Sequence, residues 1–113
     1  MIELGLQPKD LDIILSVIHE YNEIEQVLIF GSRAKGNFRN GSDVDIALKG
    51  NALNLNIISQ VSYQLNEETI LPYLFDVLNY HTISNKELKE HIDRVGVTIF
   101  IKSESTTRIN NQT

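Results

Sequence analysis

Residues 27–49 read VLIFGSRAKGNFRNGSDVDIALK, and the segment falls into three parts. Its first four residues are apolar, partly β-branched and followed by Gly31, which predicts a short buried strand that ends at the glycine. Ser32 is placed to cap a short helix through Lys35. Residues 37–42 contain an Asn-Gly pair and predict a turn.

The third part alternates between apolar and polar residues, which predicts a second strand. One face carries Val44, Ile46 and Leu48, and the other carries Asp43, Asp45, Ala47 and Lys49. Residues two apart on a strand point to the same side, about 6.6 Å apart along the chain. Asp43 and Asp45 can therefore both reach one small volume beside the preceding turn.

The rest of the chain predicts three helices and two further strands. Their expected ranges are a helix from Pro8 to about Tyr21, a helix over 53–68, a strand over 73–78 opened by Pro72, a helix from Ser84 or Asn85 to Val95 that stops at Gly96, and an edge strand over 97–101. We expect one domain over residues 1–102. The polar residues 103–113 are expected to form a mobile tail.

Composition limits the partners of the chain. The chain has 113 residues and a formal net charge of −5. Stable non-specific binding to nucleic acid, or binding to an anionic membrane, is therefore not expected. There is no cysteine, which excludes disulfides and thiolate zinc sites. No segment resembles a signal peptide or a membrane span, so the expected location is the cytoplasm.

The turn after the first strand is basic, in contrast to the acidic chain around it. Residues 31–42 contain Arg33, Lys35 and Arg39 and no acid. A local positive turn that also offers backbone N–H groups predicts a specific anionic ligand, and a metal-bound triphosphate suits the neighbouring carboxylates.

A third carboxylate, Asp76, interrupts an apolar segment whose residues should be buried, where an unpaired ionised group is costly. If the third strand lies beside the second, Asp76 joins Asp43 and Asp45. Three converging carboxylates raise one another's pKa unless a cation lies between them, and Mg²⁺ prefers such ligands.

Each feature also has an ordinary structural explanation. Asp43 and Asp45 can be a turn acid and a solvated strand residue, Gly31-Ser32 a capped turn, the basic residues a solvated surface, and Asp76 a buried acid paired with a helix N-terminus or an arginine. The Asp-x-Asp spacing alone is weak, because Asp10-Leu11-Asp12 has it on an expected helix, where the two side chains diverge. All four ordinary explanations would have to hold at the same time if these residues did not form a shared site.

Gly31-Ser32, ten intervening residues, Asp43-Val44-Asp45 and a later Asp76 resemble the signature of the DNA polymerase β-type nucleotidyltransferase superfamily. The fuller string from Gly31 to Asp45 resembles its minimal nucleotidyltransferase (MNT) branch, the antitoxin partners of HEPN-domain toxins. The resemblance covers roughly residues 10 to 102. It implies an α+β, two-layer, polymerase β palm-like fold, with a small mixed sheet packed on helices. Lys35 stands where an arginine is usual. It keeps the positive charge but lacks the planar guanidinium that can donate two hydrogen bonds to one phosphate.

The resemblance also implies the site residues. Asp43 and Asp45 would hold two Mg²⁺ ions and Asp76 one of them, so that these three carboxylates are the catalytic and metal-binding residues. Gly31 and Ser32 would contact the β- and γ-phosphates of ATP. The nucleotide-binding residues implied are Gly31, Ser32, Arg33, Lys35, Arg39 and Ser42.

The activity implied by the resemblance is transfer of AMP from ATP to a tyrosine hydroxyl of a cognate HEPN RNase toxin, which the protein would neutralise as an antitoxin. Two alternatives are a non-catalytic antitoxin that masks its partner and a small-molecule nucleotidyltransferase. A polymerase is least favoured because nothing predicts a template groove. His19, His81 and His91 lack metal-ligand spacing and are expected at the surface or an interface.

Overall fold

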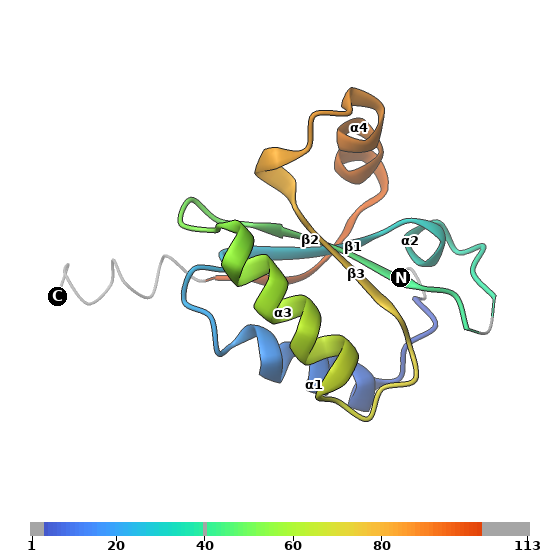
Figure 1. The fold of residues 1–113 in the computed structure, drawn as a ribbon. Coiled ribbons are helices and arrows are strands. Elements are labelled where there is room, and N and C mark those ends of the chain that lie inside the picture. Colours follow the sequence, from blue (N-terminus) through green and yellow to red (C-terminus); the bar gives the residue numbers. More distant parts are fainter. Residues whose placement is uncertain (1–3, 40, 103–113) are drawn as a thin grey trace, which may run out of the picture.

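The structure, a computed structural model, describes residues 4–39 and 41–102 (Figure 1). In chain order its elements are α1 (Pro8–Ile18), β1 (Gln26–Phe30), α2 (Ser32–Lys35), β2 (Val44–Lys49), α3 (Leu55–Glu67), β3 (Phe75–Asn79), the 3-10 helix η1 (Tyr80–Thr82), α4 (Lys86–Val95) and β4 (Val97–Ile101). The predicted tail over 103–113 and Asn40 of the predicted turn lie outside the described residues.

The four strands form one mixed sheet in the order β3-β2-β1-β4. β1 pairs antiparallel with both β2 and β4, whereas β2 and β3 are parallel because α3 returns the chain to the same end of the sheet. β4 lies at an edge, as predicted. The mixed sheet packed on helices confirms the α+β fold class.

The main core lies between the sheet and the pair α1 and α3, which cover the same face (Figure 1). β2 contributes Val44, Ile46 and Leu48, all completely buried, as its alternation predicts. From α3, Ile57, Ile58, Val61 and Leu65 face this core, because residues three or four apart lie on one side of a helix.

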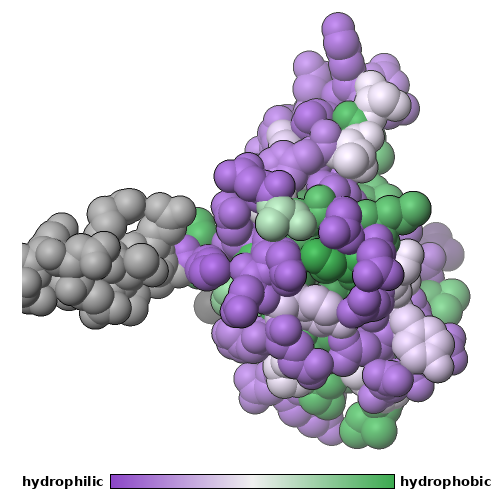
Figure 2. Space-filling view, turned by 60° about the vertical axis from the view of Figure 1, so that its left-hand side comes forward, coloured by the Kyte–Doolittle hydropathy of each residue, from purple (hydrophilic) through white to green (hydrophobic). Residues whose placement is uncertain are grey.

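α4 stands on the opposite face of the sheet (Figure 1). Its one fully buried residue, Ile92, packs with Phe30 of β1 and Ala47 of β2 in a second, smaller cluster. Asn85 caps α4 by accepting a hydrogen bond from the Leu88 N–H, and the helix ends before Gly96. The part of the molecule that α4 forms is mostly hydrophilic on the face shown in Figure 2. The second face of the sheet is therefore only partly covered.

Two local predictions are corrected. Ser32 does not cap α2: Gly31 occupies the cap position and Ser32 is the first helical residue. The third strand begins at Phe75 rather than Tyr73, and the Tyr73 hydroxyl donates to Asp10 of α1. None of the helices described is both long and apolar enough to cross a membrane.

Candidate active site

A row of register partners crosses three strands at one end of the sheet. Phe30 of β1 pairs with Asp45 of β2, and Asp45 pairs with Asp76 of β3. Neighbouring strands lie about 4.8 Å apart, and register partners point to the same face. Phe30 belongs to the cluster under α4, so Asp45 and Asp76 lie on the partly covered face.

The three acids differ in exposure. Asp43 comes immediately before β2 and is exposed, whereas Asp45 is partly buried. Asp76 is exposed, which corrects the expectation that its carboxyl is itself buried. Its neighbours Phe75 and Val77 are buried in the core on the α3 side, but Asp76 points to the other face, where the cluster under α4 reaches Leu78 of β3 and leaves Asp76 exposed.

The carboxylates act on one another electrostatically. Burial raises the pKa of Asp45, and the charges of Asp76 and Asp43 raise it further. Within the described part of the chain, no three His, Cys, Asp or Glu side chains are gathered closely enough to hold a metal ion as they stand. The oxygen donors fit Mg²⁺ in chemical type, and a divalent cation would relieve the repulsion that raises the pKa of Asp45.

Asp45→Asn is expected to stabilise the metal-free protein at neutral pH. The pKa of Asp45 is higher in the folded state than in the unfolded state, so ionisation of this carboxyl weakens folding. The gain should therefore be largest above the raised pKa and disappear as the pH falls below both values. We expect thermal unfolding in a chelating buffer at pH 7 to show a melting temperature higher by a few degrees.

The exposed residue Asp12 provides the control, since Asp12→Asn removes a carboxylate without relieving this repulsion. Added Mg²⁺ should raise the melting temperature of the wild type and of the Asp12 variant, but not that of the Asp45 variant. An Asp45 variant less stable than the wild type in chelator would contradict the argument that ionisation of this partly buried, repelled carboxyl weakens folding.

Gly31 connects the row of register partners to the basic turn. It directly follows Phe30 and has φ +76° and ψ −151°, a conformation that is essentially restricted to glycine. A Cβ at this position would collide with Oδ2 of Asp45. Glycine is therefore required at position 31 both by the backbone and by the closeness of the carboxylate.

Gly31→Ala is expected to lower any activity that uses the Asp45 carboxylate by roughly 100-fold, because the methyl group must displace this carboxylate from its place. Gly36→Ala is the control: Gly36 also has a positive φ, +81°, but a Cβ there meets nothing within 4 Å. Steady-state kinetics on both variants check the prediction. Equal losses would assign the effect to backbone strain alone.

Arg33 does not lie where a phosphate ligand would be expected. Its side chain is only 2% exposed and donates to the backbone carbonyls of Leu4, Gly5 and Ser42. The guanidinium also lies over the rings of Phe38 and Tyr73, 5.2 and 4.9 Å from their centroids. In this structure Arg33 therefore holds the turn to the segment before α1.

The other residues of the basic turn remain near the surface. Lys35 and Arg39 are exposed, and Ser42 is partly buried. The Arg39 N–H donates to Oγ of Ser42 at 2.8 Å, and the Ser42 N–H donates to the Arg39 carbonyl at 2.9 Å. Ser42 thus closes the turn, while the charged groups of Lys35 and Arg39 are free to meet an anion.

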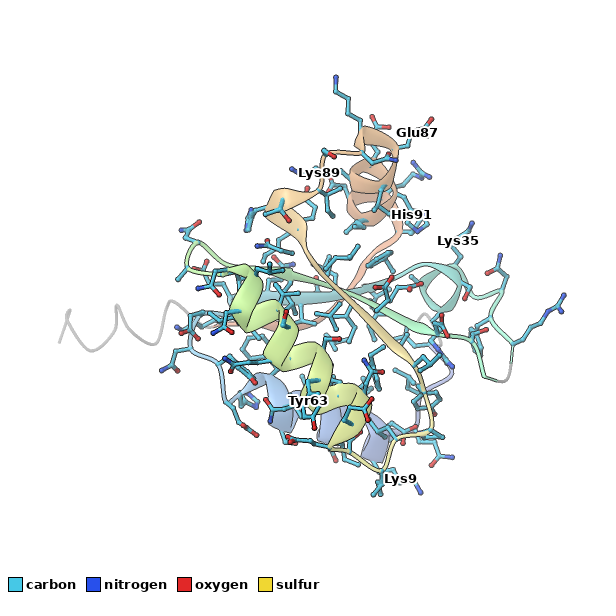
Figure 3. All side chains as sticks on the ribbon, viewed as in Figure 1. Lys9, Lys35, Tyr63, Glu87, Lys89 and His91 are labelled. Carbon is cyan, nitrogen blue, oxygen red and sulfur yellow. The ribbon has the colours of Figure 1, made fainter. Side chains whose placement is uncertain are left out.

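His91 of α4 reaches the same turn, which was not predicted. Its Nε2 accepts a hydrogen bond from the Gly31 N–H at 3.2 Å. Figure 3 shows His91 on the side of α4 that faces α2, with Lys35 rising from α2 on the same side of the sheet. The spacing of Leu88, His91, Ile92 and Val95 was the available signal, because it places His91 on the inner side of the helix.

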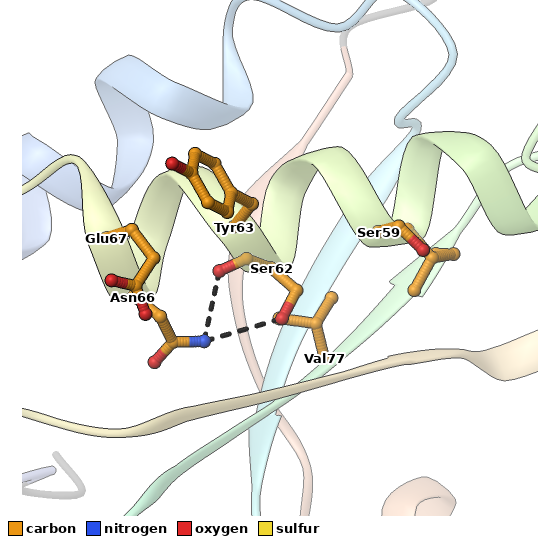
Figure 4. Close-up of a pocket in the computed structure, with 7 residues that line it drawn as sticks. Ser59, Ser62, Tyr63, Asn66, Glu67 and Val77 are labelled. Carbon is orange, nitrogen blue, oxygen red and sulfur yellow. Dashed lines mark hydrogen bonds between the residues drawn. The ribbon is translucent and has the colours of Figure 1, made fainter.

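A pocket elsewhere in the molecule contains none of the predicted site residues. It lies between α3 and β3 and is lined in part by Tyr63 and Val77 (Figure 4). Asn66, in the same pocket, bonds both to Ser62 and to the backbone N–H and carbonyl of Phe75. These contacts fix the outer edge of β3 and give the pocket a structural explanation.

Comparison with protein families places this arrangement in a known class. The family described as "Polymerase beta, Nucleotidyltransferase" matches residues 12–105. This match covers most of the chain, which therefore belongs to the polymerase β nucleotidyltransferase family. No curated protein matches the chain at a significant level.

Solved structures with the same fold include toxin–antitoxin proteins. A chain from a crystal structure of a toxin–antitoxin with AMP-PNP is 16% identical, with a TM-score of 0.69 over 88% of this chain and 79% of that one. A chain from the complex of the tri-AMPylated Shewanella oneidensis HEPN toxin with its MNT antitoxin is 14% identical, with a TM-score of 0.66 over 92% and 79%. A putative nucleotidyltransferase from Sulfolobus solfataricus is 21% identical, with a TM-score of 0.53 over 83% and 78%.

Proposed function

We propose that the protein is a Mg²⁺-dependent nucleotidyltransferase that transfers AMP from ATP to a tyrosine hydroxyl of a HEPN-domain toxin and thereby acts as its antitoxin. The observation that carries the proposal is the register of Asp76 with Asp45 beside the Gly31-Ser32 turn. Two of the structural neighbours support the substrate and the partner, since one was crystallised with AMP-PNP and another holds a tri-AMPylated HEPN toxin.

The carboxylates are the residues that would hold the metal. Asp43 and Asp45 would bind two ions, and Asp76, on the open side of the row, would bind the one nearer the acceptor hydroxyl. Two bound Mg²⁺ ions would stabilise the attacking and the leaving oxygens of an in-line displacement. The exposure of Asp43 and Asp76 and the partial exposure of Asp45 suit this role, because substrate oxygens must complete the coordination.

The remaining residues of the site position the triphosphate. Ser32 follows the Gly31 turn and would bind phosphate oxygens, while Lys35 and Arg39 supply exposed positive charge for the departing pyrophosphate. In the reaction, the tyrosine oxygen forms a bond to the α-phosphorus as the bond from that phosphorus to the bridging oxygen of pyrophosphate breaks. The hydroxyl proton passes to solvent. Positioning and charge stabilisation supply most of such catalysis.

The open part of the sheet face suits a macromolecular acceptor. α4 stands over β1 and leaves Asp76 of β3 exposed, so a tyrosine presented by another protein can approach from that side. This open approach to Asp76 supports a protein acceptor.

The direct experiment combines the purified protein with ATP, Mg²⁺ and the toxin encoded beside its gene, and then measures the intact mass of the toxin. We expect the mass to increase by one or more AMP units only when all components are present. A toxin of unchanged mass would contradict the proposal. Antitoxic protection without any added AMP would instead favour neutralisation by masking.

A further inference from the structure

The contact between α4 and the sheet is concentrated beside the proposed active site. Ile92 is completely buried against Phe30 and Ala47. One residue earlier, the His91 ring packs edge-on against the Phe30 ring, with centroids 6.1 Å apart and an angle of 78° between the planes. Phe30 is the register partner of Asp45, so α4 rests on the same row that carries the carboxylates.

The hydrogen bond between His91 and Gly31 joins α4 to the backbone of the turn. A neutral imidazole with its proton on Nδ1 leaves Nε2 free to accept the Gly31 N–H, whereas an imidazolium has no acceptor. Burial lowers the pKa of His91, and the charges of Lys35 and Arg94 lower it further. The acceptor form of His91 is therefore the one favoured at neutral pH.

The backbone at Gly31 determines where two site residues lie. Its α-carbon leaves so little space beside Oδ2 of Asp45 that a Cβ would collide with this oxygen. Ser32 is the next residue in the chain and the first of α2. A rotation of the peptide that joins Phe30 to Gly31 would therefore disturb both the Asp45 carboxylate and the start of α2.

We propose that His91 is a positioning residue that accepts the Gly31 N–H and thereby holds the turn in register with Asp45. This inference rests on the proposed nucleotidyl transfer. It deepens that function by adding a residue from α4, and it assigns different roles to Gly31 and Ser32. The Gly31 N–H is used to anchor the turn, and Ser32 provides the contacts to phosphate.

The experiment compares His91→Leu with His91→Gln. Leucine fills a similar volume without an acceptor, whereas the glutamine amide can place its oxygen near the position of Nε2. We expect His91→Leu to lower kcat by roughly tenfold or more, with a smaller change in KM for ATP, and His91→Gln to restore most of the loss. A general loss of folding would not be rescued in this way.

Tyr80→Phe is the matched control for loosening of α4. The Tyr80 hydroxyl donates to Asp93 of α4 at 2.6 Å, so this variant also removes a hydrogen bond to the helix but does not touch Gly31. Its kcat should stay close to that of the wild type. Equal losses in Tyr80→Phe and His91→Leu, or wild-type kcat in His91→Leu, would overturn the proposal.

Amide hydrogen exchange at Gly31, followed by NMR, separates this inference from the proposed function. Exchange should be faster in His91→Leu than in the wild type and should return toward the wild-type rate in His91→Gln. This measurement does not require turnover. If the protein transfers no AMP, the proposed function is refuted, but the exchange rate at Gly31 still tests whether His91 anchors the turn. Unchanged exchange in His91→Leu would refute the anchor.

Discussion

Replacing Asp43 and Asp45 together with asparagine is expected to lower nucleotidyl transfer by roughly 10³-fold or more, because the change removes the negative charge with which these residues would hold Mg²⁺. The fold should be retained, since neither side chain belongs to the apolar core and the double change removes the carboxylate of Asp45 whose pKa burial and then the charges of Asp76 and Asp43 raise. Intact mass of the toxin after incubation with ATP measures the transfer, and circular dichroism with thermal unfolding measures the fold.

Asp12→Asn is the control for the double variant, because Asp12 is an exposed acid on α1, outside the proposed site. It should transfer AMP at the wild-type rate. The double variant should also fail to protect cells from the toxin. Full protection by a double variant that transfers nothing would show that the protein neutralises its partner by masking, and the catalytic proposal would be wrong.

Arg33→Met is expected to reduce the free energy of unfolding by about 3 kcal/mol, the largest effect on stability that we predict for a residue of the glycine-rich turn. The substitution leaves the Leu4 carbonyl, in a buried setting, and the Ser42 carbonyl, in a partly buried one, without the donor that now satisfies them. The contacts of the guanidinium with the rings of Phe38 and Tyr73 are lost as well. Urea unfolding followed by circular dichroism provides the measurement.

Lys35→Met is the matched control for Arg33→Met, since it removes a positive charge from the same short helix at an exposed position. Its stability should stay within about 0.5 kcal/mol of the wild type. Arg33→Lys should rescue only part of the loss, because an ammonium cannot reach both carbonyls with the geometry of the planar guanidinium. If Arg33→Met is as stable as the wild type but transfers less AMP, the result would indicate that Arg33 binds phosphate.

Much of the fold follows from local patterns. The alternation of Val44, Ile46 and Leu48 and the helical spacing of Ile57, Val61 and Leu65 predict which faces are buried, because side-chain periodicity is set by the backbone of each element. The end of β1 just before Gly31 follows from the same kind of pattern, and so does a cap of α4 at Ser84 or Asn85, of which the structure uses Asn85. These features depend on residues close together in the sequence.

The burial of Arg33 and the exposure of Asp76 could not be predicted from local patterns. Arg33, within a glycine-rich basic turn, has the composition of a solvated surface, and only contacts with Leu4 and Tyr73, far away in the chain, explain its burial. Asp76 was expected to be buried because its neighbours are apolar, but on an edge strand covered from one side the alternate residue is exposed.

The amino-acid sequence by itself determined the element order, the family motif and the acids that the site would use, because strand alternation and short turns are local properties of the chain. The tertiary structure alone decided that Asp76 stands in register with Asp45, that Arg33 is withdrawn from the site, and that His91 holds the Gly31 amide. Each of these depends on which distant segments pair or pack, and that choice is made by burial of the whole core rather than by any one segment.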